Sequence, residues 1–271
     1  MNRIIGVNSN SYHGFSIDKA IDGIKNAGFK YIELTATKGW TEHVFSDMSF
    51  KELVSIKEEL KKADLNPFAL SGHCNLMDKN RIEDFKLNIE LAAFFGCKYI
   101  ISSIGEAHIR DKKESSDEIV ANNIFSLLPI LHKHNIKLCL ENHGKHGTGE
   151  TIMPIINMLN TPYVMINYDT ANAIFYGNTD IYEDIEKSVN KIGFMHIKDK
   201  NGLSDEWNFP ALGKGYIDFS KIFDILEKHD NECPMSIEIE FTKQGAKNLD
   251  EVNNAVKDSL NYLREINIFI E

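Results

Sequence analysis

No long block of lysine and arginine stands out in this 271-residue chain, whose formal net charge is −10 at pH 7. Such a chain has little attraction for a phosphate backbone, so we expect no nucleic-acid partner. Long hydrophobic runs are also missing, since none approaches the roughly 18 apolar residues that span a bilayer. The N-terminus has no apolar stretch of signal-peptide length either, and we therefore predict a cytoplasmic protein with no membrane partner.

Cysteine is scarce, and its spacing forms no C-x-x-C motif. Three of the four cysteines lie in or beside apolar runs, where buried free thiols are common; the four are Cys74, Cys97, Cys139 and Cys233. This distribution argues against a disulfide framework and for a reducing compartment.

Short apolar runs alternate with longer segments of helical period, and no linker divides the chain. Eight runs are predicted as strands buried on both faces: 4–8, 31–35, 67–71, 99–103, 137–141, 164–169, 193–197 and 235–240. This alternation predicts an α/β protein, a single-domain (β/α)8 TIM barrel over residues 1–271, because such barrels typically have about 250 residues. A doubly wound sheet with a dinucleotide site is disfavoured, because NSNSYHG follows the first strand instead of G-x-G-x-x-G.

Capping signals mark several helix starts between these strands. Ser49 with Glu52, and Ser115 with Glu118, are predicted to form capping boxes. Thr179 is predicted to be the N-cap of a later helix.

Reactive side chains gather at the predicted carboxyl ends of the strands, where the active sites of these barrels lie. They are His73, Glu106, His108, Glu141, His143, Asp169, Asn172, His196, Lys198, Asp199, Glu238 and Glu240. Structural explanations compete for some of the polar residues. Asn172 and Asp199 could each be a helix N-cap. Glu33, inside the apolar second strand, could be a core group paired with a neighbouring lysine.

Four of these residues resist a structural explanation, because they lie on four successive strands at or near the strand end: Glu141, Asp169, His196 and Glu238. A buried carboxylate costs several kcal/mol unless it is paired or bound to a metal. Three carboxylates at one barrel mouth would repel each other, so the set predicts one divalent metal ion with the imidazole as a further ligand. Oxygen and nitrogen donors favour Mn²⁺, with Mg²⁺, Co²⁺ or Zn²⁺ as alternatives.

The surrounding motifs resemble those of the sugar phosphate isomerase/epimerase family, which has a xylose-isomerase-like barrel and includes ketose 3-epimerases and inositol-catabolism enzymes. They are LCLENHG around Glu141, INYDTAN around Asp169, FMHIKDK around His196, MSIEIE around Glu238 and LGKGYIDFSKI from Leu212. The resemblance covers essentially the whole chain and is firmest from Leu138 onward. It implies a small carbohydrate or polyol substrate.

The resemblance also implies a metal-dependent sugar isomerase or epimerase that moves a proton at a carbon next to a carbonyl, through a metal-bound enediolate. Carried over, Glu141 and Glu238 are the proton-transferring pair, and Asp169 and His196 complete the metal ligands. Side-chain alternation leaves Glu240 open as the ligand from the eighth strand. His143 shares a face with Glu141 and is either a general acid/base or a group that orients Glu141.

Substrate contacts are predicted at five positions: His73, Glu106, His108, Asn172 and Lys198. Many family members carry a histidine where Asn172 stands, which is a departure from the family pattern. Trp40 and Trp207, in loops at the same mouth, either stack on a sugar or anchor their loops. Lys198 either neutralises an oxyanion or phosphate, or pairs with Asp199.

Other functions stay open for this scaffold. A lyase or dehydratase acting on a keto-sugar or keto-inositol would use the same metal site, with His143 or His108 as the acid/base. An endonuclease IV-like DNA-repair enzyme is a remote alternative, because it needs a histidine at position 172 and an Asp-x-His pair after the seventh strand. A non-catalytic sugar-binding barrel is a further one. The oligomeric state is open, although dimers are the commonest assembly.

Overall fold

The computed structural model describes residues 2–106 and 112–270. Eight parallel strands follow one another around a closed barrel, and the pairing of β2 with β3 closes the ring. In chain order they are β2 (Ile5–Asn8), β3 (Tyr31–Thr37), β5 (Asn66–Ser71), β6 (Tyr99–Ser103), β7 (Lys137–Glu141), β8 (Val164–Asp169), β9 (Ile192–Ile197) and β11 (Met235–Ile237). The predicted (β/α)8 fold is confirmed, and each predicted strand overlaps one of these eight.

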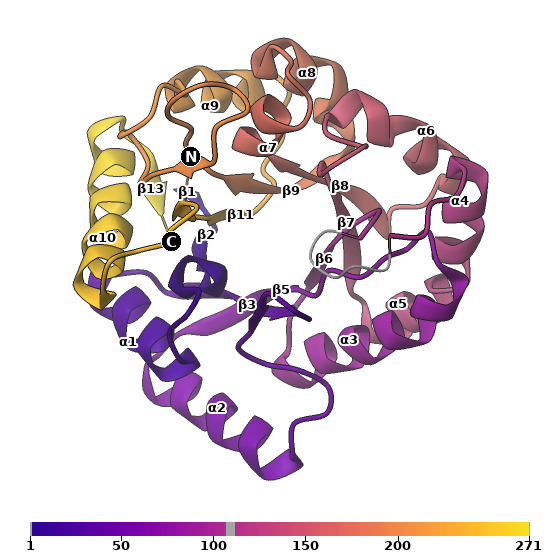
Figure 1. The fold of residues 1–271 in the computed structure, drawn as a ribbon, viewed down its shortest axis with the longest axis horizontal. Helices are drawn as coiled ribbons and strands as arrows, with labels where there is room; N and C mark the ends of the chain where they lie inside the picture. Colours follow the sequence, from indigo (N-terminus) through magenta and orange to yellow (C-terminus); the bar gives the residue numbers. More distant parts are fainter. Residues whose placement is uncertain (1, 107–111, 271) are drawn as a thin grey trace.

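A ring of helices surrounds the barrel (Figure 1). The helices are α1 (Ile17–Ala27), α2 (Phe50–Lys62), α3 (Ile82–Phe95), α4 (Asp117–Phe125), α5 (Leu128–His134), α6 (Gly149–Leu159), α7 (Thr170–Phe175), α8 (Ile181–Ser188), α9 (Phe219–Lys228) and α10 (Leu249–Glu265). Their apolar faces pack on the outer face of the barrel; in α10, for example, Val256 and Leu260 are buried. This packing forms the larger hydrophobic core.

Short elements complete the fold outside the barrel strands. β1 (Asn2–Arg3) pairs in parallel with β13 (Phe269–Ile270), and β10 (Asn208–Phe209) pairs antiparallel with β12 (Phe241–Thr242). β4 (Thr41–Glu42) pairs antiparallel with the end of β3, and 3-10 turns lie at η1 (Ser9–Tyr12), η2 (Lys79–Arg81) and η3 (Val189–Lys191).

Two of the predicted helix starts are wrong by one residue. The capping box of Ser49 with Glu52 is confirmed at α2. Ser115 does not cap α4, because its hydroxyl donates to the Met77 carbonyl at 3.0 Å and the helix starts after Ser116. Asp180, not Thr179, caps α8, because its carboxylate accepts from two amides of the first turn. In both places the sequence has consecutive residues that can cap a helix, and the structure uses the one directly after the predicted residue.

The inside of the barrel is divided into two layers. Toward the amino ends of the strands lies a small apolar cluster, here the apolar layer: Phe68, Ala69, Ile101, Cys139 and Phe194. Side chains alternate along a strand, so Cys139 and Glu141 share a face, as do Phe194 and His196. The strands therefore present ionisable groups one repeat further along, toward their carboxyl ends.

All four cysteines are buried and free, as the sequence predicts. In residues 2–106 and 112–270, no helix combines the length and the apolar character that crossing a membrane requires.

Candidate metal centre

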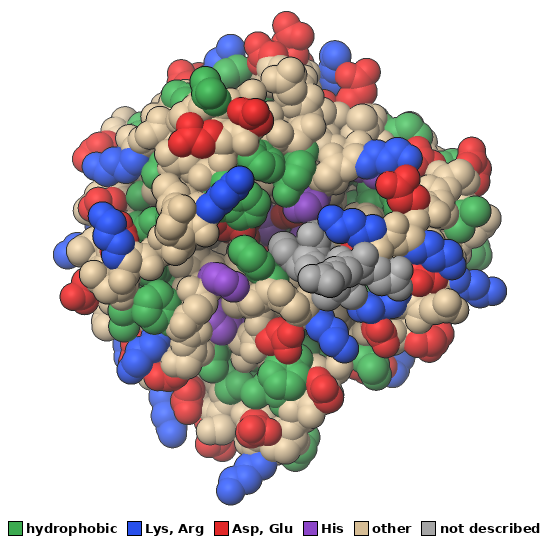
Figure 2. All heavy atoms as spheres, in the orientation of Figure 1, with side chains coloured by type: hydrophobic (Ala, Val, Ile, Leu, Met, Phe, Trp, Pro, Cys, Tyr) green, Lys and Arg blue, Asp and Glu red, His purple; other side chains and the backbone are tan. Residues whose placement is uncertain are grey.

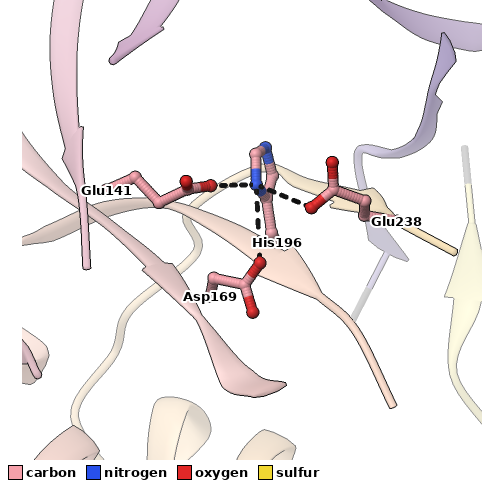
Figure 3. Close-up of side chains that lie close together, drawn as sticks. All are labelled: Glu141, Asp169, His196 and Glu238. Atoms are coloured by element: carbon pink, nitrogen blue, oxygen red, sulfur yellow. Dashed lines mark ion pairs between the residues drawn. The ribbon is translucent and has the colours of Figure 1, made fainter. Parts of the chain in front are cut away.

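The four predicted ligands come together at the carboxyl ends of the strands. Glu141, Asp169, His196 and Glu238 are all buried, and one ligand atom of each lies within 4.8 Å of the others. His196 Nδ1 lies 2.6 Å from Glu141 Oε1, 3.7 Å from Glu238 Oε2 and 3.9 Å from Asp169 Oδ2. Figure 3 shows Glu141 and Glu238 approaching the imidazole from opposite sides, with Asp169 on a third.

Local structure explains why each carboxylate faces this point. Asp169 ends β8 and caps α7, because its Oδ1 accepts from the amides of Ala171 and Asn172 at 2.9 and 2.8 Å. This leaves Oδ2 directed to the cluster. Glu238 follows β11 and stays beside β9 through its amide, which donates to the Ile197 carbonyl at 3.3 Å.

The donor atoms fit a cation. Asp169 Oδ2 and His196 Nδ1 are buried and make no hydrogen bond of suitable geometry within the described residues, although Nδ1 lies 2.6 Å from Glu141 Oε1 and Oδ2 lies 3.7 Å from Lys198 Nζ. Native proteins rarely leave buried polar atoms without a partner, so each such atom calls for an explanation. A divalent ion held by three carboxylates and an imidazole satisfies both atoms and offsets the cost of burying the charges.

Glu33 fixes the orientation of the histidine. Its carboxylate oxygens lie 3.1 and 3.0 Å from His196 Nε2, and both side chains are fully buried. We therefore assign the proton to Nε2, which leaves the Nδ1 lone pair for a ligand. The predicted pairing of Glu33 with a lysine is wrong, because the inward face of β3 lies opposite the imidazole of β9 across the barrel.

The charges of the cluster are strongly coupled. Burial raises the pKa of Asp169 to about 8, with Glu141 and Glu238 adding to the effect and Lys198 opposing it. Burial would also raise the pKa of Glu141, but the imidazoles of His73 and His196 lower it well below its ordinary value. The three carboxylates therefore need a further positive charge before all of them ionise together.

Lys198 pairs with glutamates of the last strand segment. Its Nζ lies 2.5 Å from Glu240 Oε2 and 3.2 Å from Glu238 Oε2. The expected alternative, pairing with Asp199, is wrong within the described residues. Asp199 instead accepts four backbone hydrogen bonds, two of them from Gly213 and Gly215 at 2.9 and 2.8 Å.

The role of Asp199 is to order the loop that follows β9. It is not a helix cap, so that alternative is wrong, and Asn172 is not one either, since it lies inside the first turn of α7.

The other predicted site residues surround a small inner cavity of about 30 Å³, which is lined by His73, His143, Asn172, Lys198, Trp40 and Trp207 among others. Burial lowers the pKa of His143 to about 4. Glu106 lines a neighbouring cavity together with His143 and His146. His108 lies outside the described residues. Figure 2 shows histidine side chains in a hollow near the centre of this face.

Three asparagines at the site were not predicted. Asn8 and Asn10 donate to Glu238 Oε1 at 3.2 and 2.9 Å, and Asn167 donates to Glu141 Oε1 at 3.2 Å. They hold the two glutamates in place. The sequence signal for Asn8 and Asn10 is the polar run NSNS, which begins at the last residue of the first strand.

Comparison with known proteins agrees with this architecture. The family model described as xylose isomerase-like TIM barrel matches residues 21–266. An inosose dehydratase from Histophilus somni (strain 129Pt) is 26% identical over 172 residues, which are 56% of this chain and 56% of that protein. The match thus spans little more than half the length of this curated relative.

Solved structures share the fold at low identity. D-Psicose 3-epimerase with D-tagatose from Clostridium cellulolyticum H10 has a TM-score of 0.77 and 13% identity, covering 98% of this chain and 99% of that one. A xylose isomerase-like TIM barrel protein from Mycobacterium smegmatis, in complex with magnesium, has a TM-score of 0.75 and 14% identity, covering 97% of each chain.

Proposed function

Because the chain belongs to the xylose isomerase-like TIM barrel family, we propose that it is a divalent-metal-dependent sugar isomerase or epimerase. It moves a proton at a carbon next to a carbonyl. This proposal rests on one observation: four buried side chains at the barrel mouth place one potential ligand atom each within 4.8 Å of the others.

Glu141, Asp169, His196 and Glu238 would hold the ion, with Mn²⁺ as the proposed metal and Mg²⁺, Co²⁺ or Zn²⁺ as alternatives. A bound ion would supply Lewis acidity that stabilises the negative charge developing on the substrate. Glu33 orients His196 for this role. The backbone amides that donate to Asp169 Oδ1 hold the other carboxylate oxygen, Oδ2, in position.

Glu141 and Glu238 are the proposed proton carriers. They approach from opposite sides (Figure 3), so each can reach one face of a planar enediolate. Asn167 donates a hydrogen bond to Glu141, while Asn8 and Asn10 donate to Glu238. These hydrogen bonds would hold each carboxylate in position for proton transfer. Returning the proton to the same carbon epimerises the sugar, and returning it to the neighbouring carbon isomerises it.

Substrate hydroxyls would meet the polar lining of the inner cavity, which includes His73, Asn172 and Lys198. His143 is the proposed additional acid/base. Its ring lies 4.3 Å from that of Tyr176, centre to centre, so an aromatic neighbour fixes its orientation. Glu106 and His108 stay predicted substrate contacts.

A dehydratase acting on a keto-inositol is the second candidate, because the curated relative is an inosose dehydratase. Glu141 or Glu238 would remove the proton, and His143 or His108 would be the acid/base for the departing hydroxyl. The product would be an enone, with a new ultraviolet absorbance, and no epimer would form.

One experiment separates these reactions. The protein is loaded with Mn²⁺ and incubated in D₂O with a panel of ketoses and keto-inositols, followed by NMR. Deuterium entering one carbon next to the carbonyl supports the isomerase proposal, and loss of water with enone absorbance supports the dehydratase. No exchange with any sugar, although Mn²⁺ binds, would mean a non-catalytic sugar-binding barrel.

A further inference from the structure

A second, much larger cavity lies directly outside the inner one. Its volume is about 520 Å³ against about 30 Å³ for the inner cavity, and the two share Trp40, His143, Tyr176, Trp207 and Glu240 in their walls. The cavities are therefore two parts of one path that leads from the surface to the metal centre.

The sizes of the two parts set what each can hold. A water molecule needs roughly 10–15 Å³ of cavity volume. The inner cavity, at about 30 Å³, therefore has room only for the reacting end of a sugar. The outer part lies within the roughly 300–1,000 Å³ typical of pockets that bury drug-sized ligands. A single sugar ring, with its reacting end inside, would leave much of the outer part empty.

Aromatic side chains form one wall of the outer cavity. The Trp40 ring stacks on His13 at 4.3 Å and meets the edge of Trp207 at 6.3 Å, centre to centre. Trp207 is supported from behind by Phe175 and Phe209 at 5.7 and 5.2 Å. An aromatic surface of this kind suits the C–H face of a sugar ring, which is apolar.

A second wall, which adjoins Trp207, is polar. Strand β12 carries it and pairs with β10, so that Thr242 lies opposite Asn208. Phe241 has a φ of 58°, a left-handed conformation that bulky residues rarely adopt, which indicates that the surrounding structure imposes it. Exposed Thr242, Lys243 and Gln244 then offer hydroxyl, ammonium and amide groups to the cavity.

We propose that the outer cavity is a subsite for a second sugar ring, and that the substrate is a glycoside: a keto-sugar unit joined to another sugar by a glycosidic bond. The reacting unit enters the inner cavity, while the second ring stacks on Trp207 and Trp40 and its hydroxyls meet the 242–244 segment. The identity of the reacting unit rests on the proposed function, but binding of the second ring does not.

The chain itself provides the probe for this subsite. Its two tryptophans, Trp40 and Trp207, line both the outer and the inner cavity, so selectively excited tryptophan fluorescence reports on these two adjoining cavities, and the variants below separate them. The Mn²⁺-loaded protein is titrated with cellobiose, maltose and glucose. We expect at least one disaccharide to change the fluorescence with a Kd about tenfold or more below that of glucose. Equal affinity for all three, or no response to either disaccharide, would overturn the proposal.

Matched variants locate the binding. Thr242→Phe narrows the cavity from an exposed position and should abolish the preference for the disaccharide. Trp207→Phe keeps an aromatic ring against Phe175 and Phe209 and should weaken that preference only in part. Leu203→Ala is the control, because Leu203 belongs to the same loop and is 72% exposed. Unchanged disaccharide affinity in Thr242→Phe would place the second ring elsewhere and refute the subsite.

Failure of the subsite and failure of the proposed function can be told apart. Deuterium exchange into free keto-sugars, but no advantage for disaccharides, would refute the subsite and leave the isomerase proposal standing. Tight disaccharide binding without exchange into any keto-sugar or keto-glycoside would do the reverse.

Discussion

The inward-facing side chains of β7 and β9 change from apolar to ionisable within a single strand repeat. The apolar layer packs Phe194 against Phe68 and Tyr99, with ring centres 5.5 and 5.4 Å apart. One repeat further, the ionisable layer contains Glu33, Glu141, Asp169, His196 and Glu238. The two layers have β7 and β9 in common, and both are buried.

The comparison shows how one scaffold separates stability from chemistry. Burial of aromatic rings stabilises the barrel, whereas burial of charged groups costs free energy that only precise partners or an ion can offset. Substitutions in the two layers should therefore affect different measurements.

Glu141→Gln and Glu238→Gln should each reduce deuterium exchange by about 10²–10⁴-fold, because each removes a proposed proton carrier and the negative charge of a proposed metal ligand. The folded state should persist, since the amide has the shape of the carboxyl group. Exchange is measured by NMR and unfolding by circular dichroism. Glu58→Gln, on the exposed face of α2, is the control. Full exchange in either variant would transfer the role to Glu240 or His143.

Phe194→Ala should lower the free energy of unfolding by about 3–5 kcal/mol, because it leaves a cavity in the apolar layer. Denaturant unfolding measures the change. The folded fraction should still bind Mn²⁺, since no ligand atom is removed. A variant that is stable but no longer binds Mn²⁺ would show that the two layers are not separable.

Glu33→Gln should weaken Mn²⁺ binding by about 10–100-fold, because an outer hydrogen-bond partner tunes the ligand histidine. Isothermal titration calorimetry gives the affinity independently of any activity. Unchanged affinity would mean that His196 keeps its orientation without the negative charge of Glu33.

Ser236→Ala should change the free energy of unfolding by less than about 1 kcal/mol. Ser236 lies two residues before Glu238 on the same face, and its buried hydroxyl finds no hydrogen-bond partner within the described residues. Removing the hydroxyl therefore loses no interaction. A larger loss of stability would mean that the ionisable layer extends one repeat deeper than described.

The apolar runs of the sequence predicted the strands well, because each strand is covered on both faces and so must be apolar. The candidate metal cluster was predictable for the opposite reason: Asp169 and His196 are polar residues that interrupt these apolar runs. The partner of Glu33 was not predictable, since it depends on two strands that face each other across the barrel.

Contacts made by loops were also out of reach of the sequence. The four amides that bind Asp199 come from a segment whose path follows no periodic pattern. Asn8 and Asn10 reach Glu238, which lies 230 and 228 residues away in the chain, because β2 and β11 pair where the barrel closes.

Asp169 divides its two oxygens between different tasks, one capping α7 and the other facing the metal centre. Helix α7 carries Asn172, and Tyr176 follows at its end, both in the cavity wall. The position of the Asp169 carboxylate and the shape of the cavity wall therefore both depend on how α7 begins. A substitution meant to reshape this cavity should therefore leave the first turn of α7 unchanged and be made in the other segments that line the cavity.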